Sequence, residues 1–171
     1  MRKNIKSGNK IPKDINVIIE IAERNGPVKY EFDEETNMLI VDRFISTSLE
    51  YPCNYGFIPN SLSEDGDPID VLVISNIPIN LGAMINCRPV GMLEMEDESG
   101  KDNKIIAVPS DNLTEDYLHI KSIEDVPNSL LNKIKHFFEH YKDLDAKKWV
   151  KVKNFRNAEA AKTYIAKHIL N

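Results

Sequence analysis

The chain has 171 residues, of which 42% are hydrophobic and 29% are charged, and its formal net charge is −5. This composition excludes collagen-like and low-complexity chains, and the acidic balance argues against a general nucleic-acid binder. No run approaches the roughly 18 apolar residues of a membrane span, and the basic start lacks the apolar core of a secretion signal. We therefore expect one cytoplasmic domain over residues 1–171, with no nucleic-acid and no membrane partner.

Two extended segments are predicted in the first part of the chain. Residues 15–23 are apolar and β-branched, and residues 28–45 follow an Asn-Gly-Pro turn signal. In the second segment apolar and charged positions alternate, so Lys29 and Glu31 should point to the same side of a strand. A hairpin turn over residues 33–37 should return the chain into a strand that ends by presenting Asp42 and Arg43.

Three further strands are predicted in the middle of the chain. Residues 69–74 form a continuous apolar run after Asp67-Pro68, which predicts a strand buried on both faces. Residues 86–95 and 103–108 read as two more strands joined by a polar turn. If these two strands form a hairpin, its closed end brings two carboxylates toward each other, those of Asp97 and Asp102.

The last third of the chain is predicted to be helical. Apolar residues from Leu130 to Tyr141 recur at the spacing of one stripe on an amphipathic helix. Asn157 can cap a second helix, whose apolar side includes Ala161 and Ile165. Five or more strands followed by two helices predict a mainly β fold with α elements, a closed or partly closed β-barrel with two C-terminal helices packed outside.

Carboxylates gather at two places along the predicted strands. Asp65, Asp67 and Asp70 lie at the start of the strand over residues 69–74, and Asp97 and Asp102 lie in the following hairpin. Like charges at this spacing repel one another, so a folded chain must protonate them, hydrate them or supply cations. Hard cations such as Mg²⁺ prefer carboxylate oxygens and each takes only one or two, so this many acids suggest several ions. A solvated acidic loop is the alternative, whereas an EF-hand fails because Asp70 stands where that loop requires glycine.

A rival metal motif occurs near the end of the first predicted helix. His136 to His140 read H-x-x-E-H, the pattern of one zinc protease class. On a helix the two histidines lie on roughly the opposite side from the apolar stripe, so we expect them to face solvent. The two cysteines, Cys53 and Cys87, form no zinc pattern and are expected to be free thiols.

Cationic residues stand beside the acidic positions. Taken singly, each reads as a surface charge; together they would form a site in which carboxylates hold metals and Lys and Arg hold a multiply charged anion. The stretch YPCNYGFIPN, residues 51–60, precedes the acidic positions. Its tyrosines are either core and turn residues or donors of phenolic hydrogen bonds to the anion, and the sequence leaves both readings open. The residues concerned are Lys29, Arg43, Lys104, Lys142, Tyr51 and Tyr55.

These motifs together resemble one known family. DGDPIDV, residues 65–71, has the D-x-D-P-x-D form of the soluble family I inorganic pyrophosphatases, in their compact bacterial form. The order and spacing of KYE, DR, YPCNYGFIP, DESGKDNK and HYK around it also match, so the resemblance runs from about Glu20 to Lys142. Cys53 occupies a position inside the tyrosine motif that we take to be variable.

The resemblance implies an OB-like barrel, several Mg²⁺ ions per site, a homohexamer, and hydrolysis of pyrophosphate to two phosphates by a water or hydroxide held between Mg²⁺ ions. It implies that Asp67 is the general base, and that Asp70 bridges the tightest metal to a second ion. Its implied metal ligands are Asp65, Asp70, Asp97, Asp102 and Glu31. Its implied phosphate-binding groups are Lys29, Arg43, Tyr55, Lys104, Tyr141 and Lys142, and Glu20 and Tyr51 line the site.

Other classes of function remain as alternatives at this stage. A barrel-type module could bind metal without hydrolysing pyrophosphate. A nucleic-acid-binding barrel would need a basic groove with stacking aromatic residues, which the acidic composition disfavours. A zinc protease would need the histidines of the H-x-x-E-H motif to line a cleft.

Overall fold

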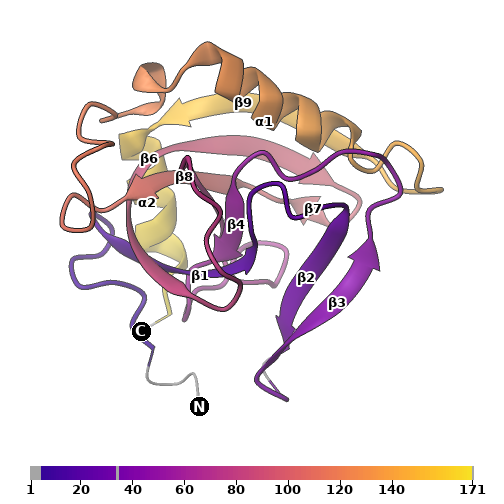
Figure 1. Cartoon of the computed structure of the whole chain (residues 1–171), viewed down its shortest axis with the longest axis horizontal. Helices are drawn as coiled ribbons and strands as arrows, with labels where there is room; N and C mark the ends of the chain where they lie inside the picture. The colour runs from indigo at the N-terminus through magenta and orange to yellow at the C-terminus, as the bar shows by residue number, and fades with distance from the viewer. Residues whose placement is uncertain (1–4, 34, 171) are drawn as a thin grey trace.

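The computed structural model describes residues 5–33 and 35–170 (Figure 1). Its helices are α1 (Asn128–His140) and α2 (Ala158–His168), with a short 3₁₀ helix η2 (Ile123–Asp125). Its strands are β1 (Ile15–Ile21), β2 (Val28–Asp33), β3 (Met38–Phe44), β4 (Asn54–Phe57), β5 (Asp70–Val73), β6 (Met84–Asp97), β7 (Gly100–Lys101), β8 (Lys104–Pro109) and β9 (Val150–Asn157). The predicted strands and both predicted helices are confirmed, although residue 34 of the first hairpin turn lies outside the described residues.

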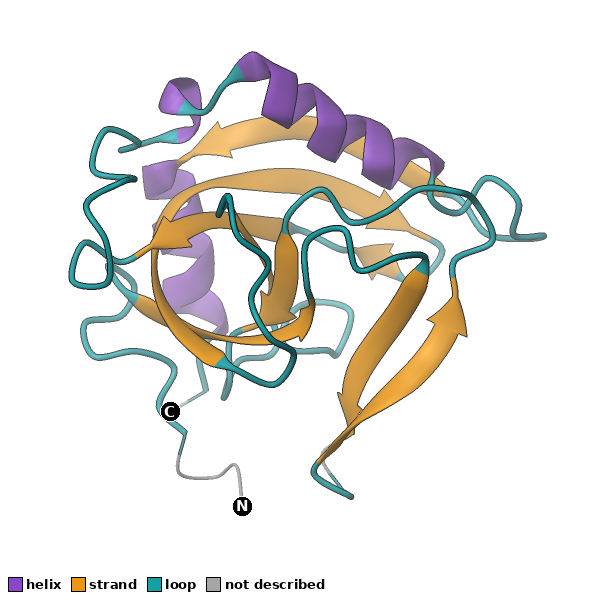
Figure 2. Cartoon of the chain, viewed as in Figure 1, coloured by secondary structure: helices purple, strands orange, loops and turns teal. Residues whose placement is uncertain are grey.

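Five of the strands close into a ring. β1 pairs with β4, β4 with β5, β8 with β6 and β6 with β1, all antiparallel, while β5 and β8 pair in parallel. β9 adds to β6, and β7 folds back onto the end of β6. Helix α1 packs on β9 and helix α2 on β6, and Figure 2 shows strands dominating the molecule. The predicted fold class, an OB-like β architecture with two helices packed outside, is confirmed.

Alternate side chains of β5 enter two hydrophobic clusters. Val71 and Val73 are fully buried in the cluster that receives Ala161 from α2, and Leu72 is fully buried in the cluster that receives Phe138 from α1. This strand is therefore buried on both faces, as predicted. A slip by one residue would exchange the two sets of side chains between clusters, so packing fixes the register.

β2 and β3 form a separate two-stranded sheet that extends beside the ring (Figure 1). Their pairing places Lys29 opposite Arg43 and Tyr30 opposite Val41, so the register shifts between these two pairs. The shift leaves Asp42 as the extra residue of a β-bulge. Charged side chains are thereby concentrated at this end of the hairpin.

Three strands lie where the sequence analysis predicted none, and one of them, β7, falls within the predicted polar turn. β4 falls inside the tyrosine motif, and a Cβ atom on its Gly56 would lie 1.9 Å from the Ile18 carbonyl oxygen, so only glycine permits this close approach to β1. β9 lies between the two helices. Its half-buried Val150 and Val152 alternate with exposed lysines, a two-residue period that indicates a strand.

The helices follow the predicted patterns. Helix α1 buries Ile134, Phe137 and Phe138, and the Asn157 side chain caps α2 by accepting a hydrogen bond from the Ala160 N–H at 3.0 Å. Within the described residues, no helix is long and apolar enough to cross a membrane.

Candidate active site

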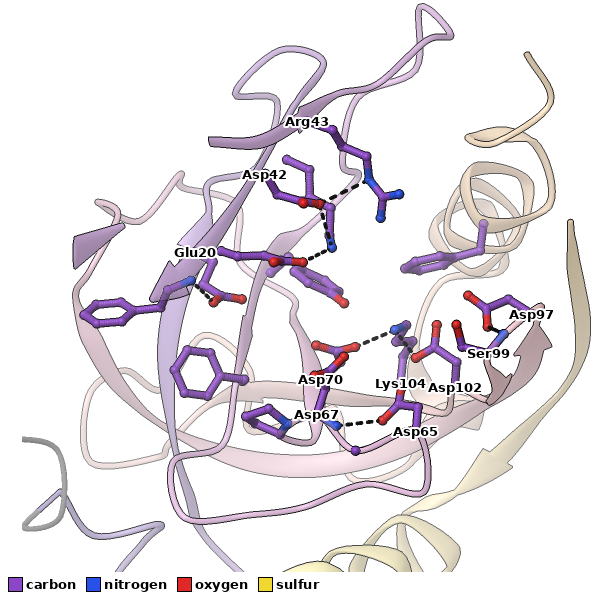
Figure 3. Close-up of a pocket in the computed structure, with 18 of the residues that line it drawn as sticks. Glu20, Asp42, Arg43, Asp65, Asp67, Asp70, Asp97, Ser99, Asp102 and Lys104 are labelled. Atoms are coloured by element: carbon purple, nitrogen blue, oxygen red, sulfur yellow. Dashed lines mark hydrogen bonds and ion pairs between the residues drawn. The ribbon is translucent and has the colours of Figure 1, made fainter. Parts of the chain in front are cut away.

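A cavity of about 710 Å³ lies between the ring and the β2–β3 hairpin (Figure 3). Every residue that the sequence analysis assigned to the site lines it, so the structure brings the whole predicted set together. The roles assigned to these residues remain predictions. The lining residues predicted from sequence are Glu20, Lys29, Glu31, Arg43, Tyr51, Tyr55, Asp65, Asp67, Asp70, Asp97, Asp102, Lys104, Tyr141 and Lys142.

The acidic loop, residues 63–68, presents two of the predicted carboxylates. The Ser63 N–H donates to the Asp67 carbonyl oxygen at 2.7 Å, and the Gly66 N–H donates to the Ser63 carbonyl oxygen at 3.2 Å. Gly66 has φ +94°, a backbone conformation that favours glycine, and this reverses the chain between Asp65 and Asp67. The Asp67 N–H also donates to the Asp65 carboxylate at 3.1 Å. The tight turn thus holds both aspartates at the edge of the cavity.

Lys104 joins two carboxylates at the floor of the cavity. Its Nζ lies 2.5 Å from Asp70 and also bonds the Asp102 carboxylate, and its side chain is only 4% exposed. Burial lowers the pKa of Lys104, but the charges of Asp70 and Asp102 outweigh burial and hold the pKa well above its usual value. Burial raises the pKa of Asp102, the Lys104 charge opposes this, and repulsion by Asp70 adds to it. A buried cation therefore compensates part of the clustered negative charge.

A second ion pair lies at the β6–β7 hairpin. Lys142, just after α1, donates to the Asp97 carboxylate at 2.7 Å, and the Ser99 N–H donates to the same carboxylate at 2.8 Å. Burial raises the pKa of Asp97, but these two hydrogen bonds bring it below its usual value. Asp97 pairs across the hairpin with Gly100, and repulsion by Asp97 contributes to the raised pKa of Asp102. Both carboxylates face the cavity, as the predicted hairpin required.

The β2–β3 hairpin contributes a mixed set of charges. Lys29 bonds Glu31 on the same side of β2, as predicted, and its Nζ lies 3.2 Å from the Asp42 carboxylate. Asp42 also lies 3.2 Å from the Arg43 Nε. Glu20, on β1, accepts the Phe32 N–H at 2.8 Å. Burial raises the pKa of Glu20 to about 8, with smaller contributions from Asp70 and Glu31.

The tyrosines are both packed and directed at the site. Tyr51, Tyr55 and Tyr141 are buried, with Tyr51 and Tyr141 packed against the Phe137 ring of α1. All three also line the cavity. Burial raises the pKa of each phenol, which keeps it protonated and able to donate a hydrogen bond at neutral pH.

The carboxylates suit a hard metal by their chemistry. Burial and repulsion from Asp102 and Asp70 raise the pKa of Asp65, so a cation bound among these carboxylates would reduce their mutual repulsion. As they are placed, no three carboxylate, imidazole or thiol groups among the described residues surround a common point. The Lys104 ammonium bridges two of the acids instead. The carboxylates therefore fit a hard ion, provided that the Lys104 ammonium gives up one of its two carboxylate contacts.

The cavity also contains residues that the sequence analysis did not assign. Asp42 was noted beside Arg43 but given no role, and its position between two cations depends on the β-bulge. Ser99, Glu98 and Lys148 line the cavity as well; the first two lie inside the matched motif DESGKDNK but were given no role, and Lys148 lies outside every motif.

The rival metal motif lies outside the site. His136 and His140 are exposed on α1, as expected, and neither lines the cavity. Cys53 and Cys87 are buried free thiols. The geometry thus gives the zinc protease reading no support.

Comparisons with known proteins identify the family of the chain. The family model for inorganic pyrophosphatase matches residues 17–171. The chain is 54% identical to the inorganic pyrophosphatase of Yersinia pestis over 161 residues, which cover 94% of this chain and 92% of that protein. The inorganic pyrophosphatase structure of Coxiella burnetii superposes with a TM-score of 0.93 at 48% identity, covering 96% of this chain and 98% of that one. The structure from Helicobacter pylori gives a TM-score of 0.93 at 44% identity, covering 98% and 97%. The chain therefore belongs to the inorganic pyrophosphatase family.

Proposed function

We propose that the cavity hydrolyses inorganic pyrophosphate to two phosphates with the help of several Mg²⁺ ions. Membership of the family makes the protein a metal-dependent diphosphatase. The observation that carries the proposal is that one cavity gathers clustered carboxylates together with lysine and arginine side chains, contributed by both the ring and the hairpin (Figure 3). Carboxylates hold hard ions, whereas Lys and Arg hold phosphate oxygens.

The metal ligands come from the ring and the hairpin. Asp65, Asp70 and Asp102 would hold the tightest ion, Asp70 would also reach a second, and Asp97 and Glu31 would hold or orient further ions. When bound, such ions lower the pKa of coordinated water and neutralise charge on the phosphates. Support comes from Asp70 and Asp102, which share one buried lysine, and from the other acids, which line the same cavity, because mutually repelling carboxylates bind cations selectively.

Asp67 serves as the general base that takes the proton of the attacking water. It is exposed at the tip of the acidic loop, where water can reach it. Burial raises the pKa of Asp67, with repulsion by Asp70 and Glu31 adding to the shift, and this makes the carboxylate a better proton acceptor. No described lysine or arginine forms an ion pair with Asp67.

The phosphate groups of the substrate are held by cations and phenols. Lys29, Arg43, Lys104 and Lys142 already contact carboxylates in the structure, so each can exchange a carboxylate partner for a phosphate oxygen when ions neutralise the acids. Tyr55 and Tyr141 donate phenolic hydrogen bonds to the same oxygens. Glu20 and Tyr51 line the site behind them.

We also propose that residues 1–171 form one domain, that the protein is cytoplasmic, and that it assembles as a homohexamer without a nucleic-acid partner. Large apolar side chains exposed on the single chain support assembly, among them Phe44 (75% exposed), Leu144 (71%) and Ile77 (69%). Light scattering coupled to size-exclusion chromatography measures the mass of the assembly. A monomer at micromolar concentration would contradict the hexamer.

Phosphate release from pyrophosphate tests the function. We expect release with Mg²⁺, none in excess EDTA, and little from a simple phosphomonoester. Full activity in EDTA, or faster turnover of the monoester, would contradict the proposal. A metal-binding module without activity would instead bind Mg²⁺ and release no phosphate. Comparing Mg²⁺ with Mn²⁺ in the same assay identifies the preferred ion.

A further inference from the structure

The acidic loop is closed at its base by one residue. The Ser63 backbone makes two of the hydrogen bonds that shape the loop: its N–H donates to the Asp67 carbonyl oxygen at 2.7 Å, and its carbonyl oxygen accepts the Gly66 N–H at 3.2 Å. The carboxylates of Asp65 and Asp67 therefore move with Ser63. Because Asp65 and Asp67 line the same cavity as Asp70 and Asp102, like-charge repulsion acts on an ion-free loop, and the position of the loop then depends on how its base is held.

The C-terminal end of the chain holds that base. The Leu62 N–H donates to the His168 carbonyl oxygen at 2.9 Å, and the Leu170 N–H donates to the Asn60 carbonyl oxygen at 2.9 Å. These two bonds flank an isolated antiparallel bridge between Ser61 and Ile169. The chain immediately before the acidic loop is thus paired, strand-like, with the last described residues.

One side-chain contact extends this attachment into the loop itself. The Ser63 Oγ lies 2.7 Å from the hydroxyl of Tyr164, which is 101 residues away on α2, and both side chains are buried. The Tyr164 ring is fixed in turn by the His168 ring, with 4.2 Å between centroids, and by the α2 face packed in the core. The Tyr164 hydroxyl therefore fixes the base of the acidic loop relative to the packed helix α2.

We propose that Tyr164 is a positioning residue for metal binding, which holds Ser63 so that Asp65 and Asp67 stay in place at the cavity. This inference rests on the roles proposed above for those two aspartates. Without the phenol, the ion-free loop spends part of its time displaced by repulsion. Metal then binds only those molecules whose acidic loop is in place, so the apparent affinity for metal falls in proportion to their fraction. Once metal is bound, the site is the same as in the wild type.

Removing the contact from either end tests the proposal. Tyr164→Phe keeps the ring and loses the hydroxyl, and Ser63→Ala loses the other partner. The Mg²⁺ concentration for half-maximal activity should rise about 3- to 10-fold in each variant, less than the 10- to 100-fold usual for groups that orient a metal ligand directly. The kcat at saturating Mg²⁺ should stay within about twofold, and the double variant should show no larger shift than either single one, because both remove the same bond.

A second readout does not depend on activity. The rise in melting temperature on adding Mg²⁺ should need correspondingly more Mg²⁺ in both variants. Thr163→Ala is the matched control, since Thr163 also lies on α2 but, among the described residues, its hydroxyl bonds only the Glu159 carbonyl oxygen, at 2.9 Å. It should leave both Mg²⁺ curves unchanged.

The outcomes separate the two proposals. If Tyr164→Phe lowers the melting temperature in EDTA but does not shift either Mg²⁺ curve, Tyr164 is merely structural and the inference is wrong. Additive shifts in the double variant would also overturn it. Asp65→Asn is the reference: if it too leaves the Mg²⁺ curves unmoved, the proposed metal role of the loop has failed rather than the attachment of the loop to α2.

Discussion

The cavity has two walls: the ring wall, formed by the strands of the ring and the acidic loop, and the hairpin wall, formed by β2 and β3. Both walls carry acidic and basic side chains, but they differ in how deeply these side chains are buried. On the ring wall, the Lys104 side chain is 4% exposed and the Asp102 side chain 12%, and Asp70 begins a strand with three fully buried residues. On the hairpin wall, the Asp42 and Arg43 side chains are 31% and 32% exposed, and within the part of the chain that the structure describes the two strands pair only with each other. Buried charges cannot be left unpaired without a large cost, whereas half-exposed ones are screened by water. Substitutions should therefore have large effects on the ring wall and small ones on the hairpin.

The largest effect is expected for Asp67→Asn, which tests whether the ring wall carries the chemistry. Asn keeps the shape of the side chain but cannot accept a proton from water. We expect turnover to fall about 10²- to 10⁴-fold, the usual scale for a general base, while the Mg²⁺-induced rise in melting temperature stays near that of the wild type. Phosphate release at saturating Mg²⁺ measures the first effect and thermal unfolding the second.

The neighbouring Glu64 provides the control for this prediction. Glu64 belongs to the same acidic loop, but it pairs with Lys101 at 3.6 Å and does not line the cavity. Glu64→Gln should leave turnover within about twofold, as expected for an exposed ion pair. Restoration of Asp67→Asn to wild-type turnover by extra Mg²⁺ would make Asp67 a metal ligand instead of the base.

The next largest effect concerns stability without metal. Lys104→Met keeps the length of the side chain but leaves the buried carboxylates of Asp70 and Asp102 facing each other. Breaking a buried ion pair from one side costs about 3–5 kcal/mol, so the free energy of unfolding in EDTA should fall by an amount of this order. Urea unfolding measures it, and Mg²⁺ should recover part of the loss by supplying the missing cation.

An exposed ion pair, Lys153 with Glu96, provides the comparison for the same urea unfolding measurement. Lys153 contacts Glu96 at 2.5 Å with its side chain 38% exposed. Lys153→Met should cost less than about 1 kcal/mol because water screens the pair. Equal losses for the two lysines would mean that the burial of Lys104 does not distinguish the ring wall.

On the hairpin wall, Arg43→Lys is expected to act mainly on substrate binding. Lysine keeps the charge but loses the planar fork that contacts two phosphate oxygens at once. We expect the KM for pyrophosphate to rise by roughly tenfold, about 1.4 kcal/mol, with a smaller change in kcat. Steady-state kinetics at fixed free Mg²⁺ measures both, and a loss confined to kcat would place Arg43 with the reacting groups of the ring wall.

Some features of both walls could be predicted from sequence. The apolar run behind Asp70 indicated a buried strand, and alternation along β2 placed Lys29 and Glu31 on one side. These signals are local, because they depend on the period of a strand. The strand β9 carried the same kind of signal at Val150 and Val152, and its omission was avoidable.

Other features could not be read from local patterns. Lys104 joins Asp70 to Asp102 only because β5 and β8 lie side by side, a pairing between segments 34 residues apart. The place of Gly56 in a strand depends on the close approach of β1, and that of Asp42 on a β-bulge. Tertiary packing decides each of these, so propensity and spacing leave them open.

The smallest effect is expected for Asp42→Asn, and its direction is informative. Asp42 neutralises Lys29 and Arg43 from 3.2 Å each, so it competes with phosphate for the two cations. If the hairpin works by charge that water screens, removing this anion should lower the KM for pyrophosphate by about two- to fivefold and leave kcat nearly unchanged, since exposed pairs are worth at most about 1 kcal/mol. If Asp42 instead holds both cations in the one geometry that binds phosphate, the KM should rise. A rise above tenfold would show that the hairpin is as tightly organised as the ring, and the contrast between the two walls would then lie in burial alone.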